Sequence, residues 1–363
     1  MNKIIRIGII GCGGIANGKH MKSLSRVADC EMVAFCDIIP ERAEEAAKAY
    51  GTPDAKTYTD YKELLKDTTI DVVHVCTPNR SHSFITVDAL EAGKHVMCEK
   101  PMAINSAEAK KMIDAAKRTG KKLSIGYQSR FRDDAIYMKQ EAEDGTFGDI
   151  YYAKATALRR RAVPTWGVFL DEKEQGGGPL IVIGTHALDL TLWMMNNYKP
   201  KYCVGTVYHK LNKDTEQGNM WGNWDPDKFT VEDSAFGFVV MENGATIILE
   251  SAWALNTLDV REAVTTLCGT KTGGDMTDGL RINGIRHGRQ YVLQPNFKAG
   301  GVAFNEGKKG ESAADREERL WIDAIRNDTA PCTLPEQAYC VTRILEGIYE
   351  SAKTGKPYYF DQE

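Results

Sequence analysis

The chain has 363 residues, of which 42% are hydrophobic and 26% are charged, and its formal net charge is -4. This composition is typical of a globular protein with room for two domains, and the slightly acidic balance argues against nucleic-acid binding. No apolar run reaches the roughly 18 residues of a membrane span, and the N-terminal stretch lacks a signal-peptide cleavage site. We therefore expect a cytoplasmic protein that binds small molecules and copies of itself, and neither nucleic acid nor a membrane.

The nine cysteines are odd in number and include no CxxC pair. They lie in apolar runs such as "MVAFCD", "DVVHVCTP" and "KHVMCEK", which have the pattern of buried strands. We predict reduced core thiols rather than disulfides, and we predict no metal site.

The first third of the chain alternates short β-branched runs with helical patterns. The runs span residues 3–10, 31–37, 71–76, 94–98 and 121–127, and helices are predicted over 40–51 and 81–93. Such alternation indicates βαβ units and a parallel sheet. We predict a nucleotide-binding domain over residues 1–127.

The pattern changes near residue 128, where longer alternating runs begin. Asn243 and Gly244 separate two such runs, which predicts a β-hairpin with a type I′ turn. The stretch 211–230 is polar but carries Trp221 and Trp224, so we expect an ordered excursion. Two amphipathic helices are predicted over 315–328 and 335–355. The second domain, residues 128–363, is thus predicted to be α+β with an antiparallel or mixed sheet, and its last helices could pack back near the first domain.

The strongest chemical motif is "IGIIGCGGIA", in which a strand leads into Gly11-x-Gly13-x-x-Ala16 and then a helix. Asp37 ends the next strand, about the distance expected for a dinucleotide-binding fold. The glycines allow main-chain amides to approach a pyrophosphate, and Asp37 can accept the ribose hydroxyls. Asp37 would repel a 2′-phosphate, although Arg42 could soften that effect, so NAD is predicted rather than NADP.

Polar residues also follow the later strands, at the end of the sheet where ligands bind in such folds. In "CTPNRSH", Asn79 and His82 are expected to face this crevice, with helix capping or solvation as the alternative for His82. In "MCEKPMAIN", Pro101 restricts Lys100 to an extended conformation, which would hold its ammonium over the crevice. A plain surface charge is the alternative for Lys100.

Together these motifs resemble the Gfo/Idh/MocA family, named for glucose-fructose oxidoreductase and inositol dehydrogenase. The resemblance extends over "IGIIGCGGIA", "CDIIPER", "CTPNRSH", "AGKHVMCEKP", "GGGPLIVIGTHALDL" and the terminal "ILEGIYESAKTGK". It implies an α/β fold with an N-terminal Rossmann domain, followed by an α+β domain with a large, open, mostly antiparallel sheet that commonly mediates oligomers. The implied activity is hydride transfer between a nicotinamide and a carbinol carbon of a sugar, inositol or related polyol.

The resemblance also assigns residues. Lys100 and His186 would be catalytic, and the peptide bond before Pro101 is often cis in such proteins. The cofactor would be bound by Gly11, Gly13, Gly14, Ala16, Asp37, Arg42, Thr77, Pro78, Asn79, His82, Glu99, Lys100 and Trp166. The substrate would be bound by Lys100, Gln128, Arg161, Trp166 and His186.

The second-domain assignments have structural alternatives. The helix of "GGGPLIVIGTHALDL" is apolar enough for His186 to be a satisfied core residue, and Arg161 and Trp166 could serve salt bridging and packing. Family members often place Asp one turn before the histidine, where this chain has Val182. That departure argues against a simple transfer of inositol dehydrogenase activity. Asp189 could orient the His186 ring or satisfy backbone donors elsewhere.

We predict an NAD-dependent oxidoreductase that acts on a secondary hydroxyl of a sugar or glycoside, with oxidation at the 3-hydroxyl of a glycoside as the leading hypothesis. Trp166, Trp221 and Trp224 could stack on a pyranose ring or anchor a loop. The alternatives are a free-sugar or inositol dehydrogenase, a glycosidase that uses transient oxidation by NAD, and a sensor without catalysis. The presence of both Lys100 and His186 argues against the sensor.

Overall fold

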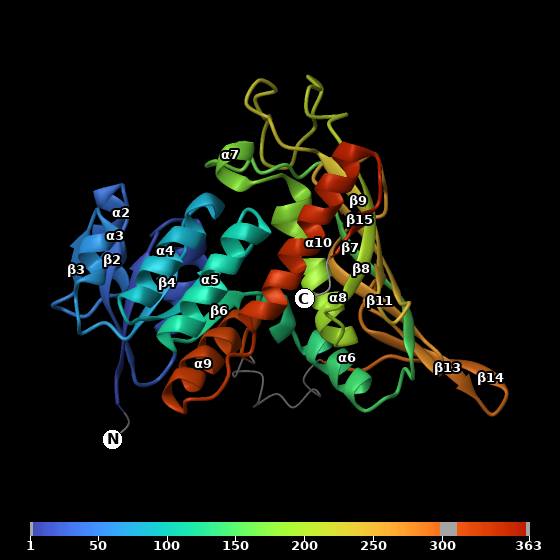
Figure 1. The fold of residues 1–363 in the computed structure, drawn as a ribbon, viewed down its shortest axis with the longest axis horizontal. Helices are drawn as coiled ribbons and strands as arrows, with labels where there is room; N and C mark the ends of the chain where they lie inside the picture. Colours follow the sequence, from blue (N-terminus) through green and yellow to red (C-terminus); the bar gives the residue numbers. More distant parts are fainter. Residues whose placement is uncertain (1–2, 298–310, 361–363) are drawn as a thin grey trace, which may run out of the picture. The chain divides into compact units, whose positions relative to one another are not determined.

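The computed structural model describes residues 3–297 and 311–360. The chain divides into two compact units. Figure 1 shows the fold with colours that follow the sequence. The first unit contains Met1–Gln128 and Glu311–Tyr339, and the second contains Ser129–Gly310 and Cys340–Glu363. The first border lies one residue from the predicted one, but the segment 311–339 belongs to the first unit, from which it is separated by nearly 200 residues of sequence.

The first unit is built on a six-stranded sheet in which every neighbouring pair is parallel. The strand order β3-β2-β1-β4-β5-β6 is that of a dinucleotide-binding Rossmann fold. All five predicted strands are confirmed, and the short β3 was not predicted. The strands are β1 Ile5–Ile10, β2 Cys30–Cys36, β3 Lys56–Tyr58, β4 Val72–Val75, β5 His95–Glu99 and β6 Leu123–Gly126.

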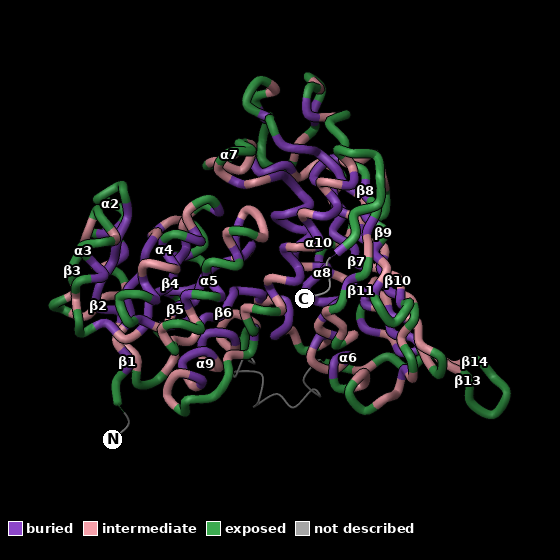
Figure 2. Tube along the Cα trace, viewed as in Figure 1, coloured by how far each residue is buried: buried purple, intermediate pink, exposed green. Residues whose placement is uncertain are grey.

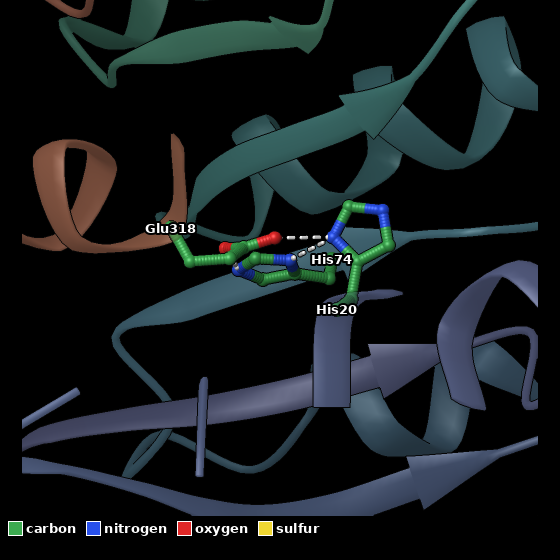
Figure 3. Close-up of side chains that lie close together, drawn as sticks. All are labelled: His20, His74 and Glu318. Atoms are coloured by element: carbon green, nitrogen blue, oxygen red, sulfur yellow. Dashed lines mark hydrogen bonds and ion pairs between the residues drawn. The ribbon is translucent and has the colours of Figure 1, made fainter. Parts of the chain in front are cut away.

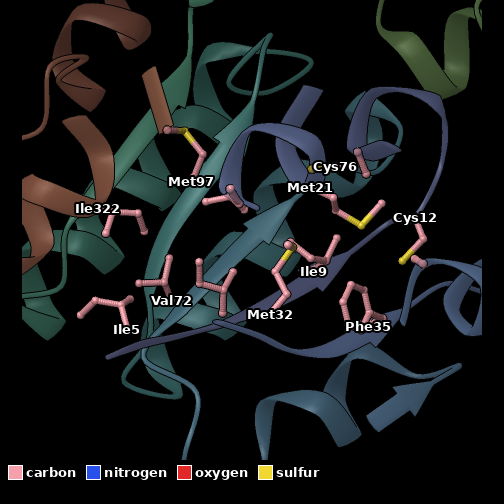
Figure 4. Packing of buried hydrophobic residues seen from close by; sticks show 14 of the residues in the cluster. Ile5, Ile9, Cys12, Met21, Met32, Phe35, Val72, Cys76, Met97 and Ile322 are labelled. Atoms are coloured by element: carbon pink, nitrogen blue, oxygen red, sulfur yellow. The ribbon is translucent and has the colours of Figure 1, made fainter. Parts of the chain in front are cut away.

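Helices connect these strands and cover the sheet. The predicted helices are confirmed as α2, which has Pro40 in its first turn, and α4. The C-terminal helix α9 adds Trp321 and Ile322 to the core cluster around β1, and Figure 4 shows Ile322 beside Ile5 and Val72. The bounds are η1 Ala16–His20, α1 Met21–Leu24, α2 Pro40–Tyr50, α3 Tyr61–Leu65, α4 Asn79–Glu91, α5 Ser106–Thr119 and α9 Ala313–Arg326.

The second unit contains a nine-stranded sheet of order β14-β13-β12-β11-β7-β10-β9-β8-β15. Its neighbouring strands are antiparallel except for β7 and β10, so the predicted mostly antiparallel sheet is confirmed. The strands are β7 Ile150–Leu158, β8 Pro200–Tyr208, β9 Ser234–Met241, β10 Thr246–Ala252, β11 Arg261–Gly269, β12 Thr272–Asp275, β13 Arg281–Arg286, β14 Arg289–Leu293 and β15 Tyr358–Tyr359.

The predicted hairpin joins β9 and β10, but its turn is not of type I′. Gly244 has a φ of 86°, whereas Asn243 is not among the residues with positive φ, and type I′ requires both. The Met241 amide donates to Ala245 O at 2.8 Å, which leaves three residues in the loop. A three-residue loop with glycine in the left-handed position explains why the sequence suggested the tighter turn.

The helices of the second unit include one long apolar segment. The stretch Glu172–Met195 meets the length and composition of a membrane span, but 83% of its most apolar window is buried within the protein, as in a core helix (Figure 2). A Cβ atom on Gly184 would lie 3.0 Å from Ser251 Oγ, so glycine at this position allows β10 to pack closely against the helix. The remaining helices are η2 Gln128–Phe131, α6 Asp133–Glu143, α7 Glu172–Gln175, η3 Leu180–Gly184, α8 Thr185–Met195 and α10 Pro335–Thr354.

Candidate active site

The glycine-rich loop after β1 has two kinds of glycine. Gly11 has a φ of 89°, and a Cβ atom there would lie only 2.7 Å from the Cys76 carbonyl group, so this position requires glycine for packing. Cβ atoms on Gly13 and Gly14 would meet nothing within 4 Å. The main chain at these two residues is therefore open to a ligand, at the point where the helical turn before η1 begins. Ala16 is fully buried beneath it.

Asp37 lies beside this loop at the end of β2. Its carboxylate accepts the Cys12 amide at 2.8 Å through Oδ2 and the Ile39 amide at 2.9 Å through Oδ1. These bonds fix the carboxylate, and each oxygen keeps a further lone pair for a ribose hydroxyl. Arg42 lies in the first turns of α2 and is exposed.

The segment after β4 provides a polar atom that fits the same ligand. Thr77 Oγ1 is buried and has no hydrogen-bond partner among the described residues. Native structures rarely leave a buried polar atom in that condition, and a bound ligand or water is the usual partner. Together with the open main chain at Gly13 and Gly14, this atom fits the predicted dinucleotide.

His82 has both ring nitrogens close to main-chain carbonyl groups. Nδ1 lies 2.8 Å from Pro101 O, and Nε2 lies 2.8 Å from Thr77 O. The buried ring therefore ties the segment after β4 to the segment after β5, and its nitrogens are directed at the protein. Its neighbours Pro78 and Asn79 start α4 at the same sheet end.

Lys100 follows the last residue of β5, and the bond between Lys100 and Pro101 is cis, as the resemblance implied. The Glu99 carboxylate accepts the Lys100 amide at 3.0 Å through Oε2. Its other oxygen, Oε1, accepts Lys19 Nζ at 2.7 Å and lies 2.8 Å from His20 Nε2. Burial alone would raise the pKa of Glu99, but Lys19 and His20 hold that pKa well below its usual value. Glu99 is therefore an ionised anchor for the Lys100 main chain.

In the second unit, His186 lies half-buried in the first turn of α8, and Val182 is buried in η3. Asp189 forms a two-point ion pair with Arg130, with Nε–Oδ2 and Nη2–Oδ1 distances of 2.9 and 2.5 Å. Both side chains are buried. The carboxylate of Asp189, which was considered as an orienting partner for the His186 ring, is thus paired with Arg130. Arg130 was not predicted as a site residue, although it lies only three residues after the predicted strand 121–127.

The remaining predicted substrate residues lie in loops of the second unit, apart from Gln128, which is half-buried in η2. Arg161 donates to Asn256 Oδ1 at 2.8 Å. Trp166 is 52% exposed and meets Trp221 edge-on with ring centroids 5.0 Å apart. Trp224 is buried and donates to Asn212 O at 2.9 Å, so it anchors the predicted excursion. Only Trp166 and Trp221 of the three tryptophans keep an exposed ring surface for stacking.

Two family models match the chain. Residues 5–127 match the model of the oxidoreductase family with an NAD-binding Rossmann fold, and residues 136–273 match the GFO/IDH/MocA C-terminal domain.

Relatives and solved structures agree with these models. The D-glucoside 3-dehydrogenase of Escherichia coli (strain K12) is 34% identical over 351 residues, which cover 97% of this chain and 96% of the relative. The inositol 2-dehydrogenase of Salmonella typhimurium (strain LT2) is 30% identical but matches over only 54% of this chain and 56% of its own length. A levoglucosan dehydrogenase in complex with NADH has the same fold, with a TM-score of 0.82 and 22% identity over 99% of this chain and 100% of that one. The chain therefore belongs to the Gfo/Idh/MocA family of NAD-binding oxidoreductases.

Proposed function

We propose that the protein is a glycoside 3-dehydrogenase, which oxidises the 3-hydroxyl of a D-glucoside to a ketone with reduction of NAD⁺. The observation that carries this proposal is the match to D-glucoside 3-dehydrogenase over nearly the whole of both chains. The inositol dehydrogenases match over about half of this chain. Val182 in place of the Asp that family members often have also argues against a simple transfer of inositol dehydrogenase activity.

In this reaction the carbinol carbon gives up its hydride and the hydroxyl gives up its proton, so that a C–O double bond forms. The nicotinamide of NAD⁺, when bound, would supply the hydride acceptor for this step. The loop with Gly13 and Gly14 would bind the pyrophosphate through main-chain amides, and Asp37 would accept the ribose hydroxyls.

Lys100 is the proposed acid-base residue, whose amine in its neutral form would accept a hydrogen bond from the reacting hydroxyl and then take its proton. Support comes from the fixed main chain of Lys100, whose amide is bound to the ionised Glu99. An acid-base group must be held within hydrogen-bond reach of the oxygen, so such anchoring is a requirement of the mechanism. His186 is the second proposed catalytic residue, on the strength of its position in the family's motif.

The test is a screen of the purified protein with NAD⁺ against methyl glucosides, free glucose, inositol and levoglucosan. We expect NADH absorbance to rise with the glucosides, and NMR of the product to place the carbonyl at C3. Oxidation of inositol in preference to every glucoside would overturn the proposal. Cleavage of the glycosidic bond without net NADH would instead identify the glycosidase alternative.

We also propose that the enzyme is cytoplasmic and a homo-oligomer. Buried cysteine side chains such as Cys36, Cys98 and Cys203 suit a reducing compartment. Val204 of β8 and Phe238 of β9 are paired across the strands and are 40% and 41% exposed, so this face of the sheet suits contact with another copy. Light scattering after gel filtration tests the oligomer, and a single-subunit mass would contradict it.

A further inference from the structure

A chain of charged side chains runs through the interior of the first unit, behind Glu99. It connects η1, β5 and helix α9. His20 Nδ1 lies 2.5 Å from Glu318 Oε1 on α9, and His20 Nε2 lies 2.8 Å from Glu99 Oε1 on β5. Lys19 Nζ bridges Glu99 Oε1 and Glu317 Oε2 at 2.7 and 2.8 Å. All five side chains are buried.

The hydrogen-bond donors and acceptors in this series of side chains determine the charge of His20. Each of its ring nitrogens faces a carboxylate oxygen, and an ionised carboxylate can only accept a hydrogen bond. Both contacts are hydrogen bonds only if both nitrogens carry a proton, which makes the ring an imidazolium. The pKa values of Glu99 and Glu318 are both held below their usual range, despite burial, by the cationic and histidine side chains beside them.

The groups around the His20 ring are consistent with that charge. Burial and Lys19 would lower the pKa of His20, but Cys76 and Glu318 raise it, and the net result is a pKa well above the usual value. His74 contacts the same edge of the ring, with its Nδ1 atom 3.3 Å from His20 Nδ1 (Figure 3). Burial lowers the pKa of His74 to about 4, so it is a neutral neighbour that can accept at Nδ1.

Three of these side chains also have the composition of a metal site. The ligand atoms of His20, His74 and Glu318 lie within 4.8 Å of one another. Two ligands of a tetrahedral zinc ion, each about 2.0–2.1 Å from the metal, would however lie roughly 3.3–3.4 Å apart. The 2.5 Å contact between His20 Nδ1 and Glu318 Oε1 is that of a hydrogen bond. The geometry therefore favours a proton between these two atoms. Elemental analysis of the purified protein tests for a metal.

This series of charged side chains ends at the main-chain amide of Lys100. Glu99 uses Oε1 for His20 and Lys19, and it uses Oε2 for the Lys100 amide. Glu318 is 298 residues from His20 in the sequence, and its helix is held in the same unit by Trp321 and Ile322 in the core. A charge on α9 thus acts on the strand end that carries Lys100, through two intervening side chains.

We propose that Glu318 is a positioning residue for the dehydrogenase reaction, acting through a doubly protonated His20 ring and through Glu99 on the main chain of Lys100. This proposal rests on the proposed role of Lys100. It predicts that loss of the Glu318 charge lowers kcat with little effect on NADH binding, because the displaced group is Lys100 at the reacting oxygen. A displacement of a catalytic group by about 1 Å can cost roughly 10²-fold in rate.

The experiment compares Glu318→Gln with Glu317→Gln. The two residues are adjacent on α9 and equally buried, but Glu317 contacts Lys19 rather than His20. Nitrogen-15 NMR of the histidine rings in the cofactor-free protein reads the charge of His20 directly. We expect an imidazolium at pH 7 in the wild type and in Glu317→Gln, and a neutral ring in Glu318→Gln.

Kinetics then test the consequence. We expect Glu318→Gln to lose roughly 10-fold to 10²-fold in kcat with an NADH dissociation constant within about twofold of the wild type, and Glu317→Gln to lose less than about threefold. Equal losses in the two variants would show a general structural effect and would overturn the proposal. Unchanged kcat in Glu318→Gln would overturn it while leaving the proposed function intact.

The wild-type protein alone keeps the proposal falsifiable if Glu318→Gln does not fold. A neutral His20 at pH 7, or stoichiometric zinc in elemental analysis of the purified protein, would contradict the charged link. If the wild type oxidises no glycoside, sugar or inositol, the proposed function fails and the catalytic part of this proposal fails with it. The NMR result still decides the charge of His20 in that case.

Discussion

Glu99 in the first unit and Glu232 in the second are both buried glutamates, exposed by 4% and 2%, yet their ionisation differs. Glu232 accepts the amides of Gly178 and Leu180 at 2.7 and 3.0 Å and the Tyr349 hydroxyl at 2.8 Å. Burial outweighs these neutral donors and raises the pKa of Glu232 to about 7. The pKa of Glu99 is instead held far below its usual value, although burial opposes this, because Lys19 and His20 lie against it.

The comparison shows that hydrogen bonds from neutral groups do not by themselves keep Glu232 ionised, whereas the combined contacts with Lys19 and His20 keep Glu99 ionised. The two sites also differ in what they hold. Glu232 fixes the turn that leads into η3, at Gly178 and Leu180. Glu99 fixes the main chain of Lys100. The ionised Glu99 therefore supports the proposed catalytic Lys100, whereas Glu232, with its raised pKa, supports the start of η3.

Glu99→Gln is expected to have the largest effect. It removes the negative charge between two buried cations, and breaking a buried pair in this way typically costs about 3–5 kcal/mol in the free energy of unfolding. Glu232→Gln at pH 5 should cost less, about 1–3 kcal/mol, because no charge is lost from an ion pair and only one main-chain donor loses its acceptor to the amide NH2. Urea unfolding of both variants tests the difference, and similar losses would contradict the opposite ionisation of the two residues.

The second effect is a pH dependence that belongs to Glu232. Its pKa of about 7 in the folded protein exceeds the usual 4.5, so the folded state binds this proton more tightly than the unfolded chain. Stability from Glu232 is thus complete below about pH 4.5 and is lost as the pH rises through 7, by about 3 kcal/mol.

Urea titrations at pH 5 and pH 8 measure this loss. Glu317 has a pKa raised to about 7 as well, mainly by burial, and contributes in the same window. The quantity to compare is therefore the wild type minus Glu232→Gln at each pH. A difference that is the same at both pH values would show that Glu232 is already ionised at pH 5.

Lys100→Ala removes the proposed acid-base side chain but keeps the main-chain amide that binds Glu99. The backbone amide that Glu99 accepts remains in this variant, so stability should change by less than about 1 kcal/mol. We expect kcat to fall by roughly 10²-fold or more, since acid-base groups contribute about 10²–10⁴, with NADH binding within about threefold of the wild type. Steady-state kinetics and calorimetry provide the measurement. A variant with near wild-type kcat would show that another group moves the proton.

The sequence predicted the parts of the site that depend on local patterns. Strand, glycine and helix spacing located the loop at Gly11, and a strand end followed by Pro101 located Lys100. The sequence could not place Glu318 beside His20, because that contact joins residues 298 positions apart and depends on how α9 packs. The ion pair of Asp189 with Arg130 was not predicted for the same reason, since Arg130 is 59 residues away on another element.

Asp37 extends the comparison to a buried carboxylate at the proposed ligand site. Its two main-chain bonds, from Cys12 and Ile39, hold the oxygens where a ribose diol would bind, and a 2′-phosphate there would meet a negative charge. We expect calorimetry to give at least about tenfold tighter binding of NADH than NADPH, which is about 1.4 kcal/mol. Asp37→Asn keeps an acceptor but removes the charge, so it should reduce this preference to within about threefold. Arg42→Ala is the control, because loss of the exposed cation on α2 should weaken NADPH alone and widen the preference. Equal affinities in the wild type would show that selection between the cofactors depends on residues other than Asp37.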